Sequence, residues 1–418
     1  WILVLSFTSV TGVQLHGPGG TMTLLGTATG LIGTYLALIM VLLASRVAPI
    51  ERLLGLDGML RWHRRLGPWP ITLIVLHVIL ITLGYAAAAS KGFGAELRSL
   101  VFDYPDVLAA TVGFLLMVAI GVVSVRAIRS RLRRETWWAL HLYIYVALAL
   151  SFAHAIVLGP TFVGHPLTRA IWIVLWLAAL ALVVVYRIGM PLARNLRMGL
   201  RVAEVRSEAP GVVSVLLEGR DLHRLPVSGG QFGLWRFMAR GMWWQAHPYT
   251  VSALPRPPYL RITVKALGDH SSAVAGLTPG TRVLLEGPYG VFTRDVLHSS
   301  RVAMIGAGIG ITSVRSLLED LPKGVAPVVV LRASSDIDTA LHEEVADLVR
   351  TRGGTLHELI GDRAQVRLDA KKLLRLVPDL RRREVYVCGP EAFVGTTVAI
   401  CNGIGVPSRA VHHEAYAL

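Results

Sequence analysis

The sequence predicts a multi-domain membrane protein, in which a bundle of apolar helices precedes an antiparallel β-barrel and an α/β domain. Hydrophobic residues make up 53% of the 418 residues, and the mean hydropathy is +0.55. These values are too high for an ordinary soluble protein and fit a membrane part joined to a soluble part. The long apolar stretches end near residue 196, where β-rich runs begin. We expect three domains, over residues 1–195, 196–297 and 298–418.

The net charge of +15 is distributed as in a membrane protein and not as in a nucleic-acid-binding protein. Arginines gather just outside the apolar stretches, which is the positive-inside pattern. The three groups are Arg46, Arg52, Arg61, Arg64 and Arg65; Arg126, Arg129, Arg131, Arg133 and Arg134; and Arg187, Arg194 and Arg197. We therefore expect a lipid bilayer, and not nucleic acid, as the partner. The two cysteines, Cys388 and Cys401, lie far from this part and form no disulfide framework or zinc spacing.

Six membrane spans are expected. Residues 1–13 are apolar but too short to cross about 30 Å of hydrocarbon, so they are interpreted as the tail of a first helix, with a cleaved signal peptide as the alternative. The basic loops fall on one side of the membrane, and the uncharged or mixed loops fall on the other. The charge rule then places everything after about residue 196 in the cytosol of a cell-membrane protein. The remaining spans are 22–45, 62–88, 107–125, 136–158 and 168–190.

Two of these spans carry two histidines each, His63 and His77 on one and His141 and His154 on the other. Ionisable side chains inside a span are rare and usually functional. At about 1.5 Å per residue, each pair is separated by roughly 20 Å along its helix, so the four side chains form two levels. A lone intramembrane histidine is more often a packing residue, but two facing levels suit two stacked six-coordinate haems. The thirteen-residue spacing of the second pair does not return to one helix face, so that helix is distorted or its haems sit differently around it.

The barrel is predicted by short β-rich runs between glycine and proline turns, from Arg201 to Gly290. Proline fixes an extended backbone in the motif HPYT and presents a tyrosine ring and a threonine hydroxyl to a planar ligand. Downstream, a lysine and the start of a short helix offer groups for a phosphate. These candidate ligand contacts are His247, Pro248, Tyr249, Thr250, Lys265, Ser271 and Ser272.

From Ser300 onward, strands alternate with helices, which predicts a parallel sheet covered on both faces. The motif GAGIGIT follows a strand and opens a helix, so its backbone can approach a pyrophosphate. Its spacing is not the full Rossmann fingerprint, and a plain strand-to-helix turn is the alternative. The residues expected to contact the dinucleotide are Gly306, Gly308, Gly310 and Thr312.

Two further strand ends are candidate nucleotide contacts. The strand after GAGIGIT ends in Arg332 and Ser334, where an NAD-binding protein usually has an acidic residue. This favours the 2′-phosphate of NADPH, with NADH possible; a solvated strand end is the alternative for the arginine. The run VYVCGP ends in Cys388, Gly389 and Pro390, so the cysteine is expected beside the nicotinamide. A turn with a buried cysteine would give the same pattern.

Taken in order, the histidine pairs and the motifs HPYTVSALP, GDHSS, GPYG, GAGIGIT, VYVCGP and HHEAYAL resemble the ferric reductase/NADPH oxidase superfamily. Members join a six-helix haem domain to a ferredoxin-reductase-like module. The resemblance covers nearly the whole chain. It implies two haems b, the inner held by His63 with His141 and the outer by His77 with His154, FAD in the barrel and a nicotinamide cofactor in the last domain. It also implies an aromatic residue over the flavin, here Tyr416, because the last residue is Leu418.

The resemblance implies transmembrane electron transfer from NADPH, through FAD and the haems, to an acceptor at the outer haem edge. Superoxide-producing members carry a histidine where this chain has Ile81, and an arginine in the second span that residues 22–40 lack. Both a ferric chelate and oxygen fit as acceptor, although these departures weaken the case for oxygen. An electron-transfer subunit or sensor serving a partner protein is the alternative. A transporter with histidine relays would leave the nucleotide motifs unexplained.

Overall fold

The computed structural model describes residues 17–335, 340–362 and 366–416, so the expected helix over residues 1–13 and the terminal Leu418 lie outside the described residues. The chain divides into two compact units. The first contains residues up to 47 and 58–187, and the second contains residues 48–57 and those from 188 onward. Each unit is described by itself below.

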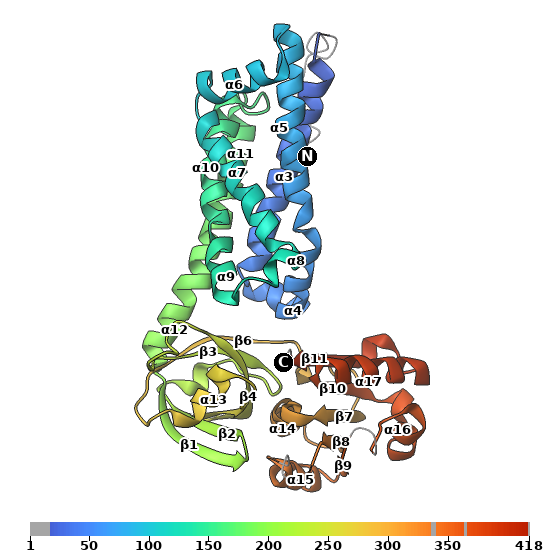
Figure 1. Ribbon diagram of the computed structural model, residues 1–418. Coiled ribbons are helices and arrows are strands. Elements are labelled where there is room, and N and C mark those ends of the chain that lie inside the picture. The colour runs from blue at the N-terminus through green and yellow to red at the C-terminus, as the bar shows by residue number, and fades with distance from the viewer. Residues whose placement is uncertain (1–16, 336–339, 363–365, 417–418) are drawn as a thin grey trace. The chain divides into compact units, whose positions relative to one another are not determined.

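The first unit is a bundle of apolar helices (Figure 1). The five expected spans that fall within the described residues are confirmed by helices long and apolar enough to cross a membrane: Gly20–Ala44 (α3), Gly58–Ala89, Val107–Ser124 (α7), Thr136–Leu158 and Pro166–Met198. α3 packs along α5 (Pro68–Ala89), and α7 packs along α10 (Ile144–Leu158). Glycines of α3 allow the close approach, since a methyl group on Gly26 would lie 2.9 Å from the nitrogen of Ile81.

The two histidine-bearing spans are each built from two helical segments. His63 lies on α4 (Ala48–Leu66), which bends at Gly55, and His77 lies on α5. His141 lies on α9 (Arg134–Leu142), and His154 lies on α10. The helix is interrupted between α9 and α10 at Tyr143, which agrees with the first of the two alternatives for the thirteen-residue spacing.

Two segments that we interpreted as loops contain helices. The basic segment from Arg46 to Arg65 is mostly α4, and the segment from Ser90 to Asp106 contains α6 (Phe93–Asp103). α6 buries Glu96 and Leu100 on one face, so it is stabilised by packing that its mixed charges concealed. The remaining helices of this unit are α8 (Arg126–Arg129) and α11 (Pro166–Val183), which continues through a π-helical turn at Val184–Gly189.

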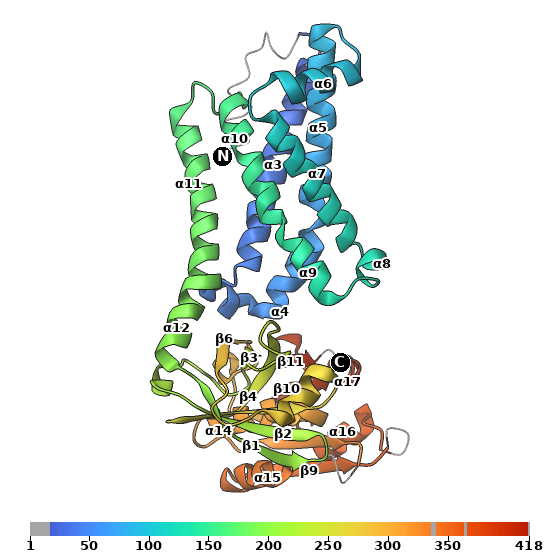
Figure 2. The same cartoon turned by 60° about the vertical axis from the view of Figure 1, so that its left-hand side comes forward.

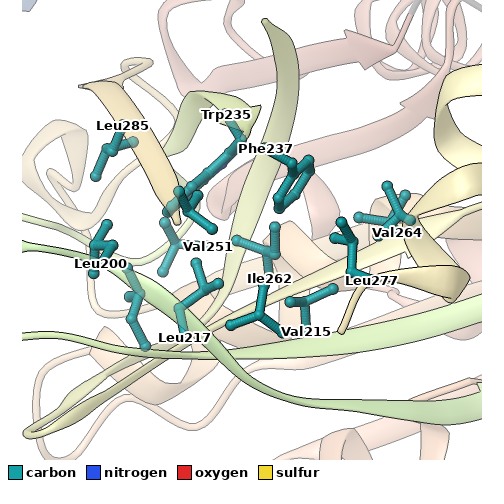
Figure 3. Packing of buried hydrophobic residues seen from close by; sticks show 14 of the residues in the cluster. Leu200, Val215, Leu217, Trp235, Phe237, Val251, Ile262, Val264, Leu277 and Leu285 are labelled. Atoms are coloured by element: carbon teal, nitrogen blue, oxygen red, sulfur yellow. The ribbon is translucent and has the colours of Figure 1, made fainter. Parts of the chain in front are cut away.

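The second unit begins with α12 (Met190–Met198) and the predicted barrel. Its six antiparallel strands follow the order β1-β2-β5-β4-β3-β6, and a bridge between Arg201 and Arg282 joins the two ends. The strands are β1 (Arg201–Ala209), β2 (Val212–Glu218), β3 (Phe232–Phe237), β4 (His247–Arg256), β5 (Tyr259–Lys265) and β6 (Val283–Tyr289). Trp235, Phe237 and Ile262 are fully buried in the barrel core (Figure 3). Burial of such side chains on alternating strand positions fixes the register.

The α/β lobe of this unit has the predicted parallel sheet, in the order β11-β10-β7-β8-β9. Helices cover both faces (Figure 2): α14 (Ile311–Asp320) and α15 (His342–Thr351) share one apolar core with the sheet, and α16 (Ala370–Leu376) and α17 (Glu391–Ile404) share the other. The strands are β7 (Val302–Ala307), β8 (Val328–Ala333), β9 (Thr355–Ile360), β10 (Glu384–Pro390) and β11 (Val411–Tyr416). Only β11 was not predicted as a strand.

Ion pairs hold the barrel and the α/β lobe together. Arg261 of β5 makes two hydrogen bonds, of 2.7 and 2.8 Å, to the carboxylate of Glu344 on α15. Arg315 of α14 contacts the same carboxylate at 2.8 Å and also Glu319. Although burial alone would raise it, the pKa of Glu344 is lowered to about 2 by the hydrogen bond and charge of Arg261 and by Arg315. The carboxylate therefore stays ionised and fixes the two lobes against each other.

Candidate functional site

The motif HPYT opens strand β4 and contacts the segment GDHSS, and both segments contain candidate ligand contacts from the sequence. The ring of His247 stacks on that of His270 with centroids 3.6 Å apart. The Tyr249 hydroxyl lies 3.3 Å from His270 Nδ1. Pro248, which lies between His247 and Tyr249 in the sequence, is exposed. Burial raises the pKa of Tyr249 to about 12, and burial together with His247 lowers the pKa of His270 to about 4. Tyr249 and His270 therefore present a neutral surface suited to a planar ligand.

Of the candidate phosphate contacts of the barrel, Ser271 is already engaged in hydrogen bonds to the backbone. Ser271 lies in α13 (Asp269–Ala273), and its hydroxyl accepts hydrogen bonds from the N–H groups of Leu267 and Gly268, at 2.8 and 3.0 Å. This side chain therefore stabilises the turn. Ser272 is exposed one residue later, and Lys265 ends β5.

The two glycine-containing loops of the α/β lobe lie side by side at the carboxyl ends of β7 and β10. A methyl group on Gly310 would lie 2.6 Å from the carbonyl oxygen of Cys388, so only glycine fits there. Gly308 has a φ of +54° with open space beside it, which leaves its backbone accessible. The hydroxyl of Thr312 donates to the carbonyl of Ile309 at 2.8 Å and so holds the turn.

Gly306 and Gly389 shape the same region. A methyl group on Gly306 would lie 3.0 Å from Val314 of α14, and Gly389 has a φ of +155° beside Ala307. Pro390 precedes the first turn of α17. The two loops therefore lie together at the carboxyl ends of β7 and β10, where the sequence predicts a dinucleotide site.

Four side chains from four elements meet beside these two glycine-containing loops. The hydroxyl of Tyr416 on β11 lies 2.8 Å from Thr250 Oγ1 on β4 and 2.5 Å from Ser313 Oγ on α14. The Cys388 thiol on β10 shares hydrogen bonds with Tyr416 and Ser313. Burial raises the pKa of Cys388 to about 12 and raises the pKa of Tyr416 well above its ordinary value, so both groups are neutral. Thr250, Cys388 and Tyr416 were candidates from separate motifs, and the structure brings them together.

Two members of this site were missed in the sequence. Ser313 directly follows the glycine motif, and Glu414 is buried at 7% exposure. Burial is the largest cause of the raised pKa of Cys388, and the charge of Glu414 is the second. Glu414 stands two residues before Tyr416, which places both on one face of a strand. That spacing was the available signal, but β11 was not predicted.

Arg332 and Ser334 lie at the carboxyl end of β8, as expected. The guanidinium of Arg332 turns back onto the backbone and donates to the carbonyl oxygens of Ala333 and Leu359, the latter at 3.2 Å. Its Nη2 is buried with no hydrogen-bond partner within the described ranges. Ser334 is exposed. Contact with a 2′-phosphate stays a prediction, because the guanidinium would have to turn outward to make it.

In the membrane unit, the histidines face each other in the pairs that the sequence predicted. The ring centroids of His63 and His141 are 6.1 Å apart, and those of His77 and His154 are 6.4 Å apart. A metal–imidazole bond of about 2 Å puts a shared iron about 3 Å from each ring centre, so two axial imidazoles need about 6 Å. Both pairs have this separation. The described residues contain no group of three or more His, Cys, Asp or Glu side chains suited to a metal, and a haem needs only two axial ligands.

Hydrogen bonds fix the orientation of three of these rings. His77 Nδ1 donates to the carbonyl of Gly26 at 2.7 Å, and His63 Nδ1 donates to that of Met40 at 3.2 Å. His141 Nδ1 lies 3.4 Å from the Ser124 hydroxyl. In each case the Nε2 atom remains for a metal, which is the usual arrangement of a ligating histidine. His154 Nδ1 is buried and has no hydrogen-bond partner in the part of the chain that the structure describes.

Comparison with known families agrees with both halves of this description. Residues 29–152 match the family described as "Ferric reductase like transmembrane component", and residues 199–293 match the "FAD-binding domain" family. The chain fits the ferric reductase/NADPH oxidase superfamily. The region that matches the ferric reductase family lies in the bundle whose apolar helices are long enough to cross a membrane, and the barrel matches a family that binds FAD.

Similar proteins include an NADPH oxidoreductase of Mycobacterium tuberculosis, 29% identical over 235 residues, which are 54% of this chain and 61% of that protein. A putative respiratory burst oxidase homolog protein G of Arabidopsis thaliana is 28% identical over 94 residues, 18% of this chain and 11% of that protein. The FAD/NAD-binding domain of a nitric oxide dioxygenase from Vibrio cholerae is similar with a TM-score of 0.46 and 20% identity, covering 53% of this chain and all of that one. The chain spans about half to three-fifths of the length of the first curated relatives it matches.

Proposed function

We propose that this protein carries electrons from NADPH, through FAD and two b-type haems, to a small acceptor on the outer face of the membrane. The observation that supports it best is the facing of two histidine pairs with ring centroids 6.1 and 6.4 Å apart. When bound, FAD accepts the two electrons of a hydride, and each haem passes electrons singly. We propose that the chain consists of the three domains expected from its sequence, over residues 1–195, 196–297 and 298–418.

The histidines would supply the four axial ligands. Carbonyl groups of α3 hold the rings of His63 and His77 through Nδ1, and the Ser124 hydroxyl lies within reach of His141 Nδ1. Such bonds fix the tautomer and make Nε2 a better ligand. Because two histidines would hold each haem iron, the acceptor would take its electron without binding to the iron. A ferric chelate and oxygen both meet this requirement, and Ile81 at the outer level favours the chelate.

The reductase module would hold its cofactors with the residues already described. His247, Tyr249 and Thr250 face the flavin, and Pro248 keeps their strand extended. The backbone of Gly308 and the first turn of α14 face the pyrophosphate of the nicotinamide cofactor. The residues proposed for the remaining contacts are Lys265, Ser271 and Ser272 for FAD phosphate; Gly306, Gly310, Thr312, Arg332 and Ser334 for the dinucleotide; and Cys388, Gly389, Pro390 and Tyr416 around the nicotinamide and flavin rings.

The arginine groups beside the spans support a cytosolic reductase module. With this orientation His63 and His141 form the inner pair, and His77 and His154 form the outer pair. A cytosolic module would have direct access to cellular NADPH.

Haem content and reduction in the purified full-length protein test the proposal. We expect two b-type haems per chain, both reduced by NADPH only when FAD is bound. Replacing His77 or His63 by Ala should remove one haem each, whereas His165→Ala, outside both pairs, should keep two. Unchanged haem content in the first two variants, or no haem reduction by NADPH, would refute the assignment.

A further inference from the structure

The ring of His141 on α9 stacks against the indole of Trp137, one helical turn earlier. The two ring centroids are 5.1 Å apart, and the rings are inclined by only 26°. The guanidinium of Arg129 on α8 lies over the same indole, with its Cζ atom 4.3 Å from the ring centroid. An arginine over an indole face is a cation–π contact, and it places a positive charge within about 10 Å of the His141 ring.

The same indole also affects the hydrogen bond of the His141 ring. Trp137 Nε1 donates to the hydroxyl oxygen of Ser124 at 3.3 Å, and that oxygen lies 3.4 Å from His141 Nδ1. A hydroxyl oxygen can accept two hydrogen bonds, so the indole shares the acceptor that His141 would use. This long bond to a shared acceptor makes the imidazole a less basic ligand than His77, which donates to a backbone carbonyl at 2.7 Å.

Both features should make the proposed inner haem easier to reduce. A nearby positive charge stabilises ferrous iron, which carries one positive charge fewer than ferric iron. A less basic ligand stabilises the ferric form less. We propose that Arg129 and Trp137 are positioning residues, which act through His141 to raise the reduction potential of the inner haem. The reaction is a one-electron reduction with FAD as the donor, so this inference rests on the proposed function and on ligation by His63 and His141.

An anchor for the basic loop is the alternative explanation for these contacts. Five arginines lie between residues 126 and 134, and the positive-inside pattern accounts for their number without any role in electron transfer. An anchor would stabilise the fold, but it would leave the reduction potential of a bound haem unchanged. The potential therefore distinguishes the two roles, and stability does not.

Redox titration of the full-length, FAD- and haem-loaded protein in lipid nanodiscs tests the proposal. At about 10 Å, a unit charge changes an equilibrium by about twofold in water and by about tenfold or more in a protein interior. Arg129 is exposed, so Arg129→Gln should lower the ratio of reduced to oxidised inner haem, at a fixed potential, by about two- to tenfold. For a one-electron couple this is a shift of roughly 20–60 mV. The outer step should stay in place, and His77→Ala, which should keep only the inner haem, identifies the inner step.

Four variants separate the contributions of charge and ring. Arg129→Lys keeps the charge and should restore most of the potential. Trp137→Phe keeps a stacked ring but frees the Ser124 hydroxyl for His141, so it should also lower the inner potential, and it covers the case in which Arg129→Gln loses haem. The matched controls are Arg131→Gln, at another exposed position of the same loop, and Trp138→Phe, whose side chain is 53% exposed. Both controls should keep the wild-type potential.

A wild-type inner potential in Arg129→Gln and Trp137→Phe, each with two low-spin haems bound, would overturn this proposal and leave the proposed haem ligation intact. Equal shifts in Arg129→Gln and Arg131→Gln would overturn it as well, because the total charge of the loop would then set the potential. If the wild-type protein binds no haem, the proposed function itself fails, and the inference about Arg129 and Trp137 fails with it.

Discussion

A single methyl group on α3 should prevent His77 from holding the proposed outer haem. Gly30 faces the ring of His77, and a methyl group there would lie 2.5 Å from Nδ1 and 2.9 Å from Cε1. Carbon and nitrogen atoms not bonded to each other need about 3.5 Å, so the imidazole must move by roughly 1 Å in Gly30→Ala. The 2.7 Å bond from His77 to Gly26 cannot survive this movement.

The displacement is large compared with the tolerance of ligation. The His77 and His154 rings are 6.4 Å apart, and two axial imidazoles need about 6 Å. Overpacking of this kind costs about 1–3 kcal/mol, while replacing glycine by alanine within a helix returns about 1 kcal/mol. The helix should therefore stay folded while the ligand moves, so that haem loss reports on the site and not on general unfolding.

Haem content, the low-spin absorption spectrum and the signals of electron paramagnetic resonance measure the effect. We expect Gly30→Ala to retain one haem per chain, with the inner low-spin signal intact. Gly33→Ala is the matched control on the same helix, because the three atoms nearest to its methyl group would belong to Ile74 and Leu73, at 3.1 Å. Two low-spin haems in Gly30→Ala would refute His77 as an outer ligand in this geometry.

Three other predictions concern the module and the acceptor. The pKa of Glu344 lies at about 2, below its ordinary value of 4.5, so the stability that the carboxylate contributes is complete above pH 4.5 and is lost as the pH falls toward 2. Between about pH 5 and pH 3, the melting temperature of Glu344→Gln should therefore fall less than that of the wild type. Equal falls would exclude the ion pair of Glu344 with Arg261 as the cause. Arg332→Ala should raise the KM for NADPH far more than that for NADH, and equal increases would contradict contact with the 2′-phosphate. In proteoliposomes at air saturation, ferric-chelate reduction should exceed superoxide release, and the reverse ratio would overturn the interpretation of Ile81.

Most of the architecture could be predicted because its signals are local. The spans are set by runs of apolar residues, and the barrel strands are set by β-rich runs between turns. α6 was not predicted because its charged residues are typical of a loop, although Glu96 and Leu100 are buried. The strand β11 was missed because its residues VHHEAY lack a clear alternation, and its pairing with β10 decides its conformation.

The candidate site could be predicted only in part, because some of its residues are brought together by contacts between segments distant in sequence. The histidine pairs could be predicted from spacing, since two helices repeat nearly the same separation. The cluster of Thr250, Ser313 and Tyr416 could not, because its members lie 63 and 103 residues apart in sequence. Each has an ordinary local context, and they are brought together by the packing of α14 against β4 and by the pairing of β11 with β10.

The helix α3 carries no histidine in its described length, yet it orients one ring at each level. The carbonyl of Met40 accepts from His63, and that of Gly26 accepts from His77. The two acceptors are fourteen residues apart on α3, and the two donors are fourteen residues apart on the neighbouring span. Because the helices run antiparallel with matched spacing, sliding α3 along its axis would change both hydrogen bonds together. The orientations of the two histidine rings are therefore linked through α3, and a residue inserted between Gly26 and Met40 would put one level out of register while leaving the other in place.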